Sequence, residues 1–251
     1  MDAVKEVRTV RAKDGLRIEF DHYKGGHEKI IVIAHGFYNS KASSLLQELG
    51  QCLLGKYDVA IMDFRGHGKS GGLFHWASKE PMDLEAVLRC LRPDYQKIAV
   101  IGFSFGAGIG MIVAGTTGLI DNLIFVSGPS EFKRIDFRWW ELDIDNDIIF
   151  NLGPGGRGKG VRPGPFWHPK IQPMDIVEKL SVPVCYIHGD ADWTIKPWHA
   201  QVLYERTPTR KHLRILEGGP HAEYLMRKHK QQFVGEIKVW LEQTFEQEDG
   251  A

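Results

Sequence analysis

The chain has 251 residues, of which 43% are hydrophobic and 25% are charged, and its 32 basic side chains equal its 32 acidic ones. A chain of this length buries roughly 70–75% of its unfolded surface, so it needs no disulfide or metal to fold, and the length predicts one domain or at most two. The apolar content excludes a disordered chain. The balanced charge gives no general attraction to nucleic acid or to an anionic membrane surface.

The cysteines and the apolar stretches indicate where the protein resides. Three cysteines without a Cys-x-x-Cys pair predict neither a disulfide framework nor a metal site. The amino-terminal stretch is charged and lacks an apolar core, so we expect no signal peptide. The longest apolar stretch, 107–120, is broken by glycine and is shorter than the roughly 20 residues of a membrane span. We therefore expect a soluble, cytoplasmic protein, whose oligomeric state stays open, a homodimer included.

Strand and helix patterns alternate along most of the chain. Two alternating stretches, 7–12 and 16–23, flank an Asp14-Gly15 pair, which predicts a β-hairpin. Unbroken β-branched runs follow, as is typical of parallel strands covered on both faces. These runs are 30–34, 59–64, 98–103, 123–127, 184–188 and 213–216. Amphipathic helices are expected at 44–54, 81–91 and 231–245. This alternation predicts an α/β fold with a largely parallel sheet.

One long segment interrupts this alternation. No clear strand is expected from Pro129 to Pro173, and these residues far exceed an ordinary connection of about 2–6 residues. The segment is either a floppy surface insertion or a small lid whose aromatic residues face a pocket. Clustered tryptophan is costly to expose, which favours the lid. We therefore expect a core domain of residues 1–128 and 174–251 and a lid of residues 129–173.

The sharpest motif is Gly102-Phe103-Ser104-Phe105-Gly106. It follows a predicted strand and opens a helix-like stretch, which is the context in which a Gly-x-Ser-x-Gly turn holds its serine strained and exposed. A serine hydroxyl is a weak nucleophile that needs a base, and the base needs an orienting acid. The motif therefore predicts a nucleophilic Ser104 and directs attention to the acids and histidines that follow.

Candidates for the acid and the base lie after the next two strands. Asp190 and Asp192 follow one strand and His221 follows the other, so both sites fall at carboxyl ends of parallel strands. One aspartate is expected to support the turn and the other to reach the histidine. The pattern His188-Gly189-x-x-Asp192 favours Asp192 as the acid.

Three other histidines compete for the role of base. His212 begins a strand and so lies at the wrong end of the sheet, while His199 and His229 lie on predicted helices and are expected to be solvated. His221, in a Gly-Gly-Pro-His turn, is therefore favoured.

An acyl-transfer reaction also needs donors to a developing oxyanion. One donor is expected to be the backbone N–H of Phe105, the residue after the nucleophile. The second is expected from the loop that reads His35-Gly36-Phe37, through the N–H of Phe37. We interpret His35 as a residue that fixes this loop by hydrogen bonding rather than as a base.

The stretch Asp63–Ser70 contains several glycines and a Lys-Ser ending that invite comparison with a phosphate-binding loop. Its glycines do not have the spacing of such a loop. We expect a structural loop that the charges of Asp63 and Arg65 hold.

Together these motifs resemble the α/β-hydrolase superfamily over nearly the whole chain. The matching stretches are HGF at 35–37, DFRGHGKS at 63–70, GFSFG at 102–106, HGDAD at 188–192 and GGPH at 218–221. Within the superfamily the chain is similar to serine esterases of the feruloyl/cinnamoyl-esterase and acylglycerol-lipase-like group. The resemblance implies an eight-stranded, mostly parallel sheet flanked by helices, a lid after the sixth strand, a serine-esterase mechanism and no cofactor.

The expected activity is hydrolysis of a small-molecule ester with a short- to medium-chain or aromatic acyl group, by Ser104, Asp192 and His221. Aromatic residues of the lid are candidate substrate-binding residues: Trp139, Trp140, Phe166 and Trp167. A serine at the turn argues against dehalogenases and epoxide hydrolases, which resemble the chain but use aspartate there. A serine peptidase or amidase, a thioesterase, a carbon–carbon hydrolase and a non-catalytic ligand-binding protein stay open.

Overall fold

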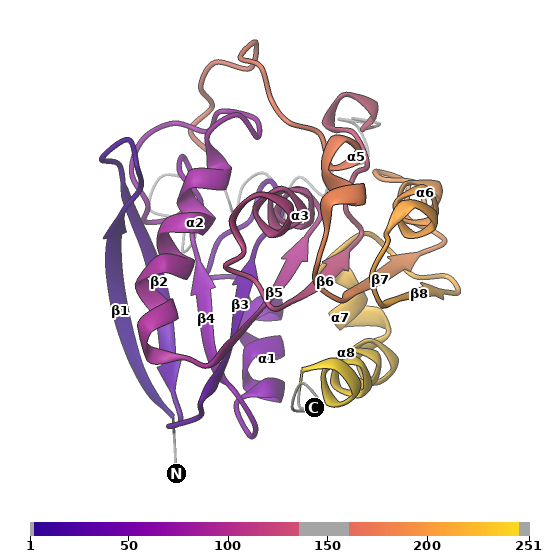
Figure 1. Ribbon diagram of the computed structural model, residues 1–251, viewed down its shortest axis with the longest axis horizontal. Helices are drawn as coiled ribbons and strands as arrows, with labels where there is room; N and C mark the ends of the chain where they lie inside the picture. The colour runs from indigo at the N-terminus through magenta and orange to yellow at the C-terminus, as the bar shows by residue number, and fades with distance from the viewer. Residues whose placement is uncertain (1–2, 136–160, 246–251) are drawn as a thin grey trace.

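The molecule is built on one eight-stranded sheet (Figure 1). The computed structural model describes residues 3–135 and 161–245. The strands are β1 (Val4–Arg11), β2 (Arg17–Lys24), β3 (Lys29–Ala34), β4 (Asp58–Met62), β5 (Lys97–Phe103), β6 (Asn122–Val126), β7 (Val184–Gly189) and β8 (Lys211–Leu216). Their order across the sheet is β1-β2-β4-β3-β5-β6-β7-β8. β2 pairs antiparallel with β1 and β4, and the other pairs are parallel. The predicted largely parallel sheet is confirmed.

The first two strands form the predicted hairpin. Arg11 pairs with Arg17, and Gly15 in the turn has a φ of 81°. This left-handed conformation costs glycine little because glycine has no Cβ.

Helices cover both faces of the sheet. They are α1 (Ser44–Leu53), α2 (Glu80–Leu91), α3 (Phe105–Thr117), α5 (Pro173–Ile176), α6 (Trp198–Arg206), α7 (Tyr224–Lys228) and α8 (Lys230–Thr244), with short 3₁₀ turns at Arg92–Asp94, Phe132–Arg134 and Val177–Lys179. Apolar side chains of α2, α3 and α6 belong to one buried cluster, and those of α1, α7 and α8 belong to the other. The sheet is therefore the middle of three layers.

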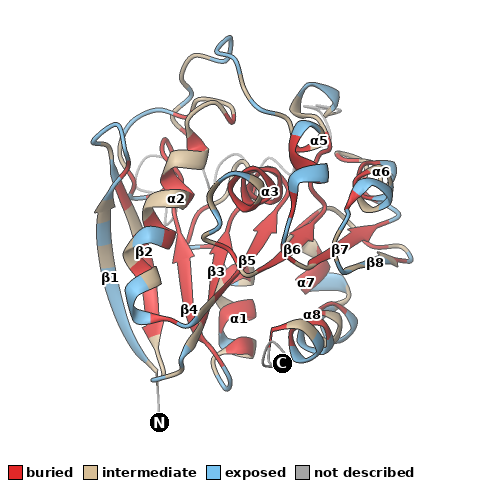
Figure 2. Ribbon diagram, in the orientation of Figure 1, coloured by how far each residue is buried: buried red, intermediate tan, exposed pale blue. Residues whose placement is uncertain are grey.

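The central strands are buried on both faces, as their unbroken apolar sequences predict (Figure 2). Successive side chains of a strand point to opposite faces. In β3, accordingly, Ile30 and Val32 pack in one cluster, while Ile31 and Ile33 pack in the other.

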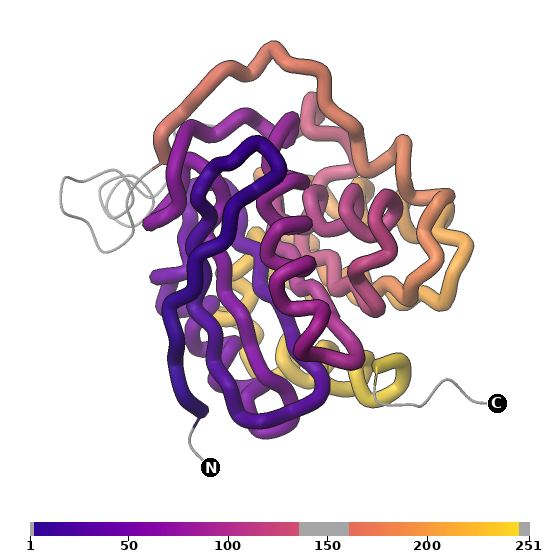
Figure 3. The backbone as a smooth tube through the Cα atoms, turned by 60° about the vertical axis from the view of Figure 1, so that its left-hand side comes forward, coloured from indigo at the N-terminus to yellow at the C-terminus, as the bar shows by residue number. Residues whose placement is uncertain are grey.

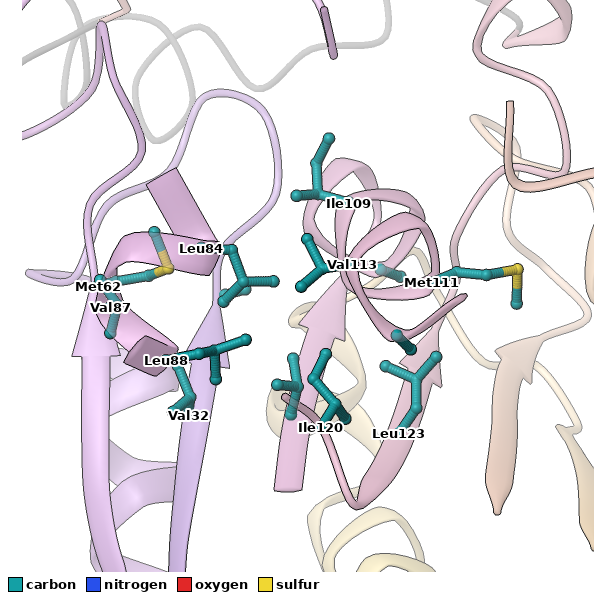
Figure 4. Close-up of a cluster of buried hydrophobic side chains, with 14 of the residues drawn as sticks. Val32, Met62, Leu84, Val87, Leu88, Ile109, Met111, Val113, Ile120 and Leu123 are labelled. Atoms are coloured by element: carbon teal, nitrogen blue, oxygen red, sulfur yellow. The ribbon is translucent and has the colours of Figure 1, made fainter. Parts of the chain in front are cut away.

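Helix α2 illustrates how sequence periodicity becomes packing. Pro81 stands in its first turn, where no backbone N–H is needed. Leu84, Val87 and Leu88 recur at helical spacing and gather with Val32 and Met62 of the sheet (Figure 4).

The segment 161–172 crosses the end of the sheet where the parallel strands finish (Figures 1 and 3). Arg162 N–H donates to Gly66 O at 2.7 Å, and Phe74 N–H donates to Arg162 O at 2.8 Å, so its start is tied to the loop after β4. The expected lid, 129–173, is described only at 129–135 and 161–173, and the division into core and lid stays a prediction. Within the described ranges, no helix combines the length and apolarity needed to cross a bilayer.

Candidate active site

Ser104 stands in a tight turn between β5 and α3. Its backbone has φ 51° and ψ −115°, a left-handed conformation that a non-glycine residue rarely adopts. Its N–H donates to Val126 O of β6 at 2.8 Å, which fixes the turn against the neighbouring strand. The residue as a whole is buried, with 8% of its surface exposed.

Glycines on both sides of the serine permit this turn. A Cβ at Gly102 would lie 2.5 Å from the Cα of Ala107, and a Cβ at Gly106 would lie 2.4 Å from Ala34 O. Real Cβ atoms essentially never approach that closely, so the start of α3 packs against β5 and against the end of β3 only because Gly102 and Gly106 lack side chains.

The structure brings together the serine, aspartate and histidine that the sequence singled out. His221 Nε2 lies 2.9 Å from Ser104 Oγ, and His221 Nδ1 lies 2.7 Å from Asp192 Oδ2. Ser104, Asp192 and His221 follow β5, β7 and β8, respectively. In the chain, His221 is 29 positions from Asp192 and 117 positions from Ser104. Parallel strands place these loops at one edge, where open α/β sheets form their ligand sites.

Asp192 is buried, with 1% exposure, and its carboxylate is surrounded by donors. Oδ1 accepts from the N–H groups of Thr194 at 3.0 Å and Ile195 at 2.9 Å, while Oδ2 faces His221. Burial alone would raise the pKa of Asp192, but the charges and hydrogen bonds of His221 and His188 outweigh it and hold the pKa well below the ordinary carboxyl range. The acid therefore stays ionised throughout the neutral and mildly acidic range.

One expectation about the two aspartates is wrong. Asp192 both supports the turn, through Oδ1, and reaches His221, through Oδ2. The side chain of Asp190 lies at the surface instead. A single carboxylate carries both tasks because its two oxygens have lone pairs in different directions.

His188, at the end of β7, is a second histidine beside Asp192. It is fully buried, and its Nε2 lies 2.7 Å from Ile195 O and 3.3 Å from Asp192 Oδ2. Because a carbonyl can only accept, Nε2 carries the proton. His188 thus joins the turn to the carboxylate, a role that the motif alone did not reveal.

The loop after β3 lies directly against the nucleophile. A Cβ at Gly36 would be 3.2 Å from Ser104 Cβ, closer than nine in ten real Cβ contacts, so a side chain at position 36 would require one of the two to shift. His35 is buried, its Nδ1 lies 2.7 Å from Gly36 O, and its Nε2 accepts the N–H of Phe64 at 3.1 Å. The expected role of His35 in fixing the loop is confirmed.

Phe105, the other expected oxyanion donor, is the first residue of α3. N–H groups in the first turn of a helix have no partner within the helix, and the helix dipole favours negative charge there. The backbone therefore offers a positive partial charge next to Ser104.

The other histidines differ in their surroundings. His199 was expected to be solvated, but it is 1% exposed, and its Nδ1 lies 3.1 Å from Ser130 N and 2.8 Å from Ser130 Oγ. Burial, together with the charge of His188, lowers the pKa of His199 to about 4. His229, between α7 and α8, is half-buried. His212 lies at the start of β8, as predicted, and pairs with Glu236.

Aromatic side chains from several loops surround the nucleophile's turn. Phe105 contacts Phe74 and Phe132, with ring centroids 4.9 and 5.7 Å apart, and Phe37 contacts Phe74 and Trp76 at 5.0 and 5.1 Å. Phe37, Trp76 and Phe132 are half-buried. The sequence motifs did not single out Phe74, Trp76 or Phe132.

The expected substrate-binding residues have varied placements. Trp139 and Trp140 lie outside the described residues. Phe166 and Trp167 lie at the surface, 65% and 71% exposed, with ring centroids 5.5 Å apart.

The stretch Asp63–Ser70 is a structural loop, as predicted. Asp63 accepts the N–H groups of Lys41 and Lys69, each at 2.7 Å. Arg65 is buried and pairs with Asp83 at 2.6 Å and Asp14 at 2.7 Å. In the described part of the chain, no group of three or more His, Cys, Asp or Glu side chains gathers in a way that could hold a metal ion.

Comparison with known proteins agrees with this architecture. A family model described as alpha/beta hydrolase fold matches residues 29–147. The uncharacterized protein YqkD of Bacillus subtilis is 28% identical in an alignment over 216 residues, which covers 79% of this chain and 67% of YqkD. The Pyrococcus furiosus esterase Pf2001 superposes with a TM-score of 0.77 at 20% identity, over 96% of this chain and 93% of that one. Est1E of Butyrivibrio proteoclasticus, solved with ferulic acid bound, gives 0.73 at 21% identity, over 95% and 99%.

These likenesses show the fold. The chain has the α/β-hydrolase fold.

Proposed function

We propose that this α/β-hydrolase is a serine carboxylesterase in which Ser104 is the nucleophile, His221 the general base and Asp192 the orienting acid. One observation carries the proposal: hydrogen bonds run from Ser104 Oγ through His221 to Asp192, although the three residues come from three separate strand ends. A nucleophile bonded to a base that a buried acid orients is the arrangement of serine hydrolases.

In the acylation step, Ser104 Oγ attacks the ester carbonyl while His221 Nε2 takes its proton. Asp192 accepts a hydrogen bond from the Nδ1–H of His221, which leaves Nε2 unprotonated and able to act as the base. The carboxylate then stabilises the imidazolium. The imidazolium gives its proton to the leaving alcohol, and the ester bond breaks. Water repeats the sequence on the acyl-enzyme and releases the acid.

The negative charge of each tetrahedral intermediate falls on the former carbonyl oxygen. The backbone N–H groups of Phe37 and Phe105 are the proposed donors to it, and each such donor is worth about 2.7–4 kcal/mol in a comparable serine enzyme. The approach of Gly36 to Ser104 and the position of Phe105 at the start of α3 support this assignment. These steps require no cofactor.

The half-buried aromatic side chains around the turn support an uncharged, aromatic or medium-chain acyl group. Phe37, Trp76 and Phe132 offer ring surface that an acyl chain would cover. Ferulic acid, bound in Est1E, is an aromatic acid of this kind. Phe166 and Trp167, with their exposed rings, would contribute only if the substrate extends beyond the turn.

A substrate panel tests the proposal. It contains C4, C8 and C16 p-nitrophenyl esters, a methyl hydroxycinnamate, a thioester and a dipeptide amide, each with the wild-type protein and with Ser104→Ala. We expect hydrolysis of the C4, C8 or hydroxycinnamate esters at least about 10³-fold faster in the wild type, the scale on which loss of a triad member acts.

A preference for the C16 ester would contradict the acyl-group proposal. Faster turnover of the thioester or the amide than of every ester would contradict the carboxylesterase assignment. Equal activity in Ser104→Ala would contradict the whole assignment.

A further inference from the structure

A hydrogen bond joins the loop after β3 to the loop that carries His221. Asn39 Nδ2 donates to Glu223 Oε1, across 184 positions of the chain. Asn39 lies two residues after Phe37, and Glu223 lies two residues after His221. The pair therefore connects the proposed oxyanion loop to the proposed base loop, and neither side chain has a part in the acyl-transfer steps above.

Each partner directly follows a residue with a strained backbone. Tyr38 has a φ of 61° and Ala222 a φ of 48°, both in the left-handed region that non-glycine residues rarely adopt. Such conformations persist only where surrounding contacts determine the backbone. The hydrogen bond between Asn39 and Glu223 is a contact that acts on both strained positions at once.

The carboxylate of Glu223 also lies against the part of the loop that approaches the nucleophile. A Cβ at Gly36 would be 3.2 Å from Ser104 Cβ and 3.7 Å from Glu223 Oε2. The nucleophile and the glutamate carboxylate are therefore both neighbours of Gly36. Asn39 Oδ1 accepts the Ser40 N–H at 2.8 Å, which orients the amide so that Nδ2 faces Glu223.

We propose that Asn39 and Glu223 are positioning residues, which hold the 35–39 loop so that the Phe37 N–H stands at the distance from Ser104 that oxyanion stabilisation requires. This inference rests on the proposed serine-hydrolase function. An oxyanion donor acts on the transition state more than on the bound substrate. Weakening the bond between the two loops should therefore lower kcat and leave KM nearly unchanged.

Variants that exchange the hydrogen-bond donor and acceptor between positions 39 and 223 test the proposal. Asn39→Asp keeps the oxygen that accepts the Ser40 N–H but sets a second carboxylate against Glu223. Glu223→Gln keeps an acceptor for Asn39 and removes one charge. In the double variant, the new amide at position 223 can donate to the new carboxylate at position 39, so the hydrogen bond is restored with opposite polarity.

The primary readout is the second-order rate at which an alkyl fluorophosphonate labels Ser104, because labelling passes through the oxyanion site whatever ester or amide the enzyme prefers. We expect Asn39→Asp to lower this rate about 10- to 100-fold, which is less than the loss of a complete donor. Glu223→Gln and the double variant should stay within about threefold of the wild type. Values of kcat should follow the labelling rates, with KM changed less than about twofold.

Glu217→Gln is the matched control for Glu223→Gln, because Glu217 is an exposed carboxylate shortly before His221 in the chain and both substitutions change the net charge equally. Circular dichroism and thermal melting verify the fold of each variant. If Asn39→Asp does not fold, Glu223→Ala, which removes the acceptor without adding a charge, takes its place and should lower the rate in the same way.

Two results would overturn the inference while leaving the proposed function intact: wild-type labelling rates in folded Asn39→Asp, or a double variant as slow as Asn39→Asp. A wild-type protein that fluorophosphonate does not label would instead refute the proposed function.

Discussion

Asp192 has two roles, and each is carried by a different oxygen of its carboxylate. Oδ1 holds the turn after β7, through the N–H groups of Thr194 and Ile195, and Oδ2 faces His221. Orientation of the base and folding of the turn are therefore coupled. A variant that keeps the turn but alters Oδ2 separates the two roles.

Asp192→Asn is that variant. The new amide can still accept the two backbone N–H groups through its oxygen, but its NH₂ group would face His221 Nδ1 and would favour the tautomer with the proton on Nε2. That tautomer cannot take a proton from Ser104, so we expect kcat to fall about 10⁴-fold, as in the corresponding aspartate variant of a serine protease. Steady-state kinetics with the ester of the panel that the wild type hydrolyses fastest measure this fall in kcat.

Asp190→Asn is the control for this change, since Asp190 is exposed on the same turn. It should retain wild-type kinetics. A loss in Asp192→Asn below about tenfold, or an equal loss in Asp190→Asn, would refute the assigned acid.

The sequence predicted the identity of these residues better than their surroundings. Ser104 and His221 stand in local motifs whose glycines and flanking strands are visible in the chain. His199 was misjudged because its burial depends on Ser130, which is 69 residues away and joins it through the fold. The bond between Asn39 and Glu223 spans 184 residues and leaves no local pattern.

Among the elements, α3 and its approach to β3 determine where the nucleophile lies. Strands were predicted because their β-branched runs are buried on both faces, a property that the run itself displays. The tie between 161–164 and the loop after β4 was not predicted, because Arg162 and Phe74 pair through backbone groups that carry no residue signature.

Two glycine-to-alanine substitutions in helices test the close approach of α3 to β3. Gly106→Ala should lower the free energy of unfolding by at least about 3 kcal/mol, or prevent folding, because the new Cβ meets the backbone oxygens of Ala34 and His35 at 2.4 and 2.5 Å. Gly235→Ala in α8 has nothing within 4 Å and should stabilise the protein by about 0.5–1 kcal/mol, since alanine favours helix. Urea unfolding measures both. Equal effects of the two changes would contradict the packing described.

At the scale of the whole molecule, buried histidines link folding to pH. His22 donates from Nε2 to Tyr95 OH, which itself donates to Asp58, while Nδ1 faces Arg8. Burial, aided by the charges of Arg8 and Lys24, lowers the pKa of His22 to about 4, the same value as for His199. Burial also lowers the pKa values of His35 and His67.

We therefore expect acid to destabilise the fold as the pH falls from about 6.5 to about 4. Unfolded histidines bind protons near their ordinary pKa of 6.5, whereas His22 and His199 in the folded protein bind them only near a pKa of about 4. The unfolded state binds more protons across this window, so the free energy of unfolding rises with pH. Urea unfolding at intervals from about pH 7 to about pH 4.5 measures the slope.

A double variant, His22→Gln with His199→Asn, removes two of these groups. Its stability should depend less steeply on pH than that of the wild type, although it will be less stable at neutral pH. A flat wild-type curve, or an unchanged slope in the double variant, would refute the linkage.

The central claim is that Ser104 is a nucleophile that His221 activates. The most direct measurement uses mass spectrometry after reaction with an alkyl fluorophosphonate. The mass of the intact protein gives the stoichiometry of the adduct, and the peptide masses give its location. We predict one equivalent on Ser104 in the wild type, none in folded Ser104→Ala, and much slower labelling in His221→Ala. An adduct on another residue, or a folded wild-type protein that stays unlabelled, would contradict the claim.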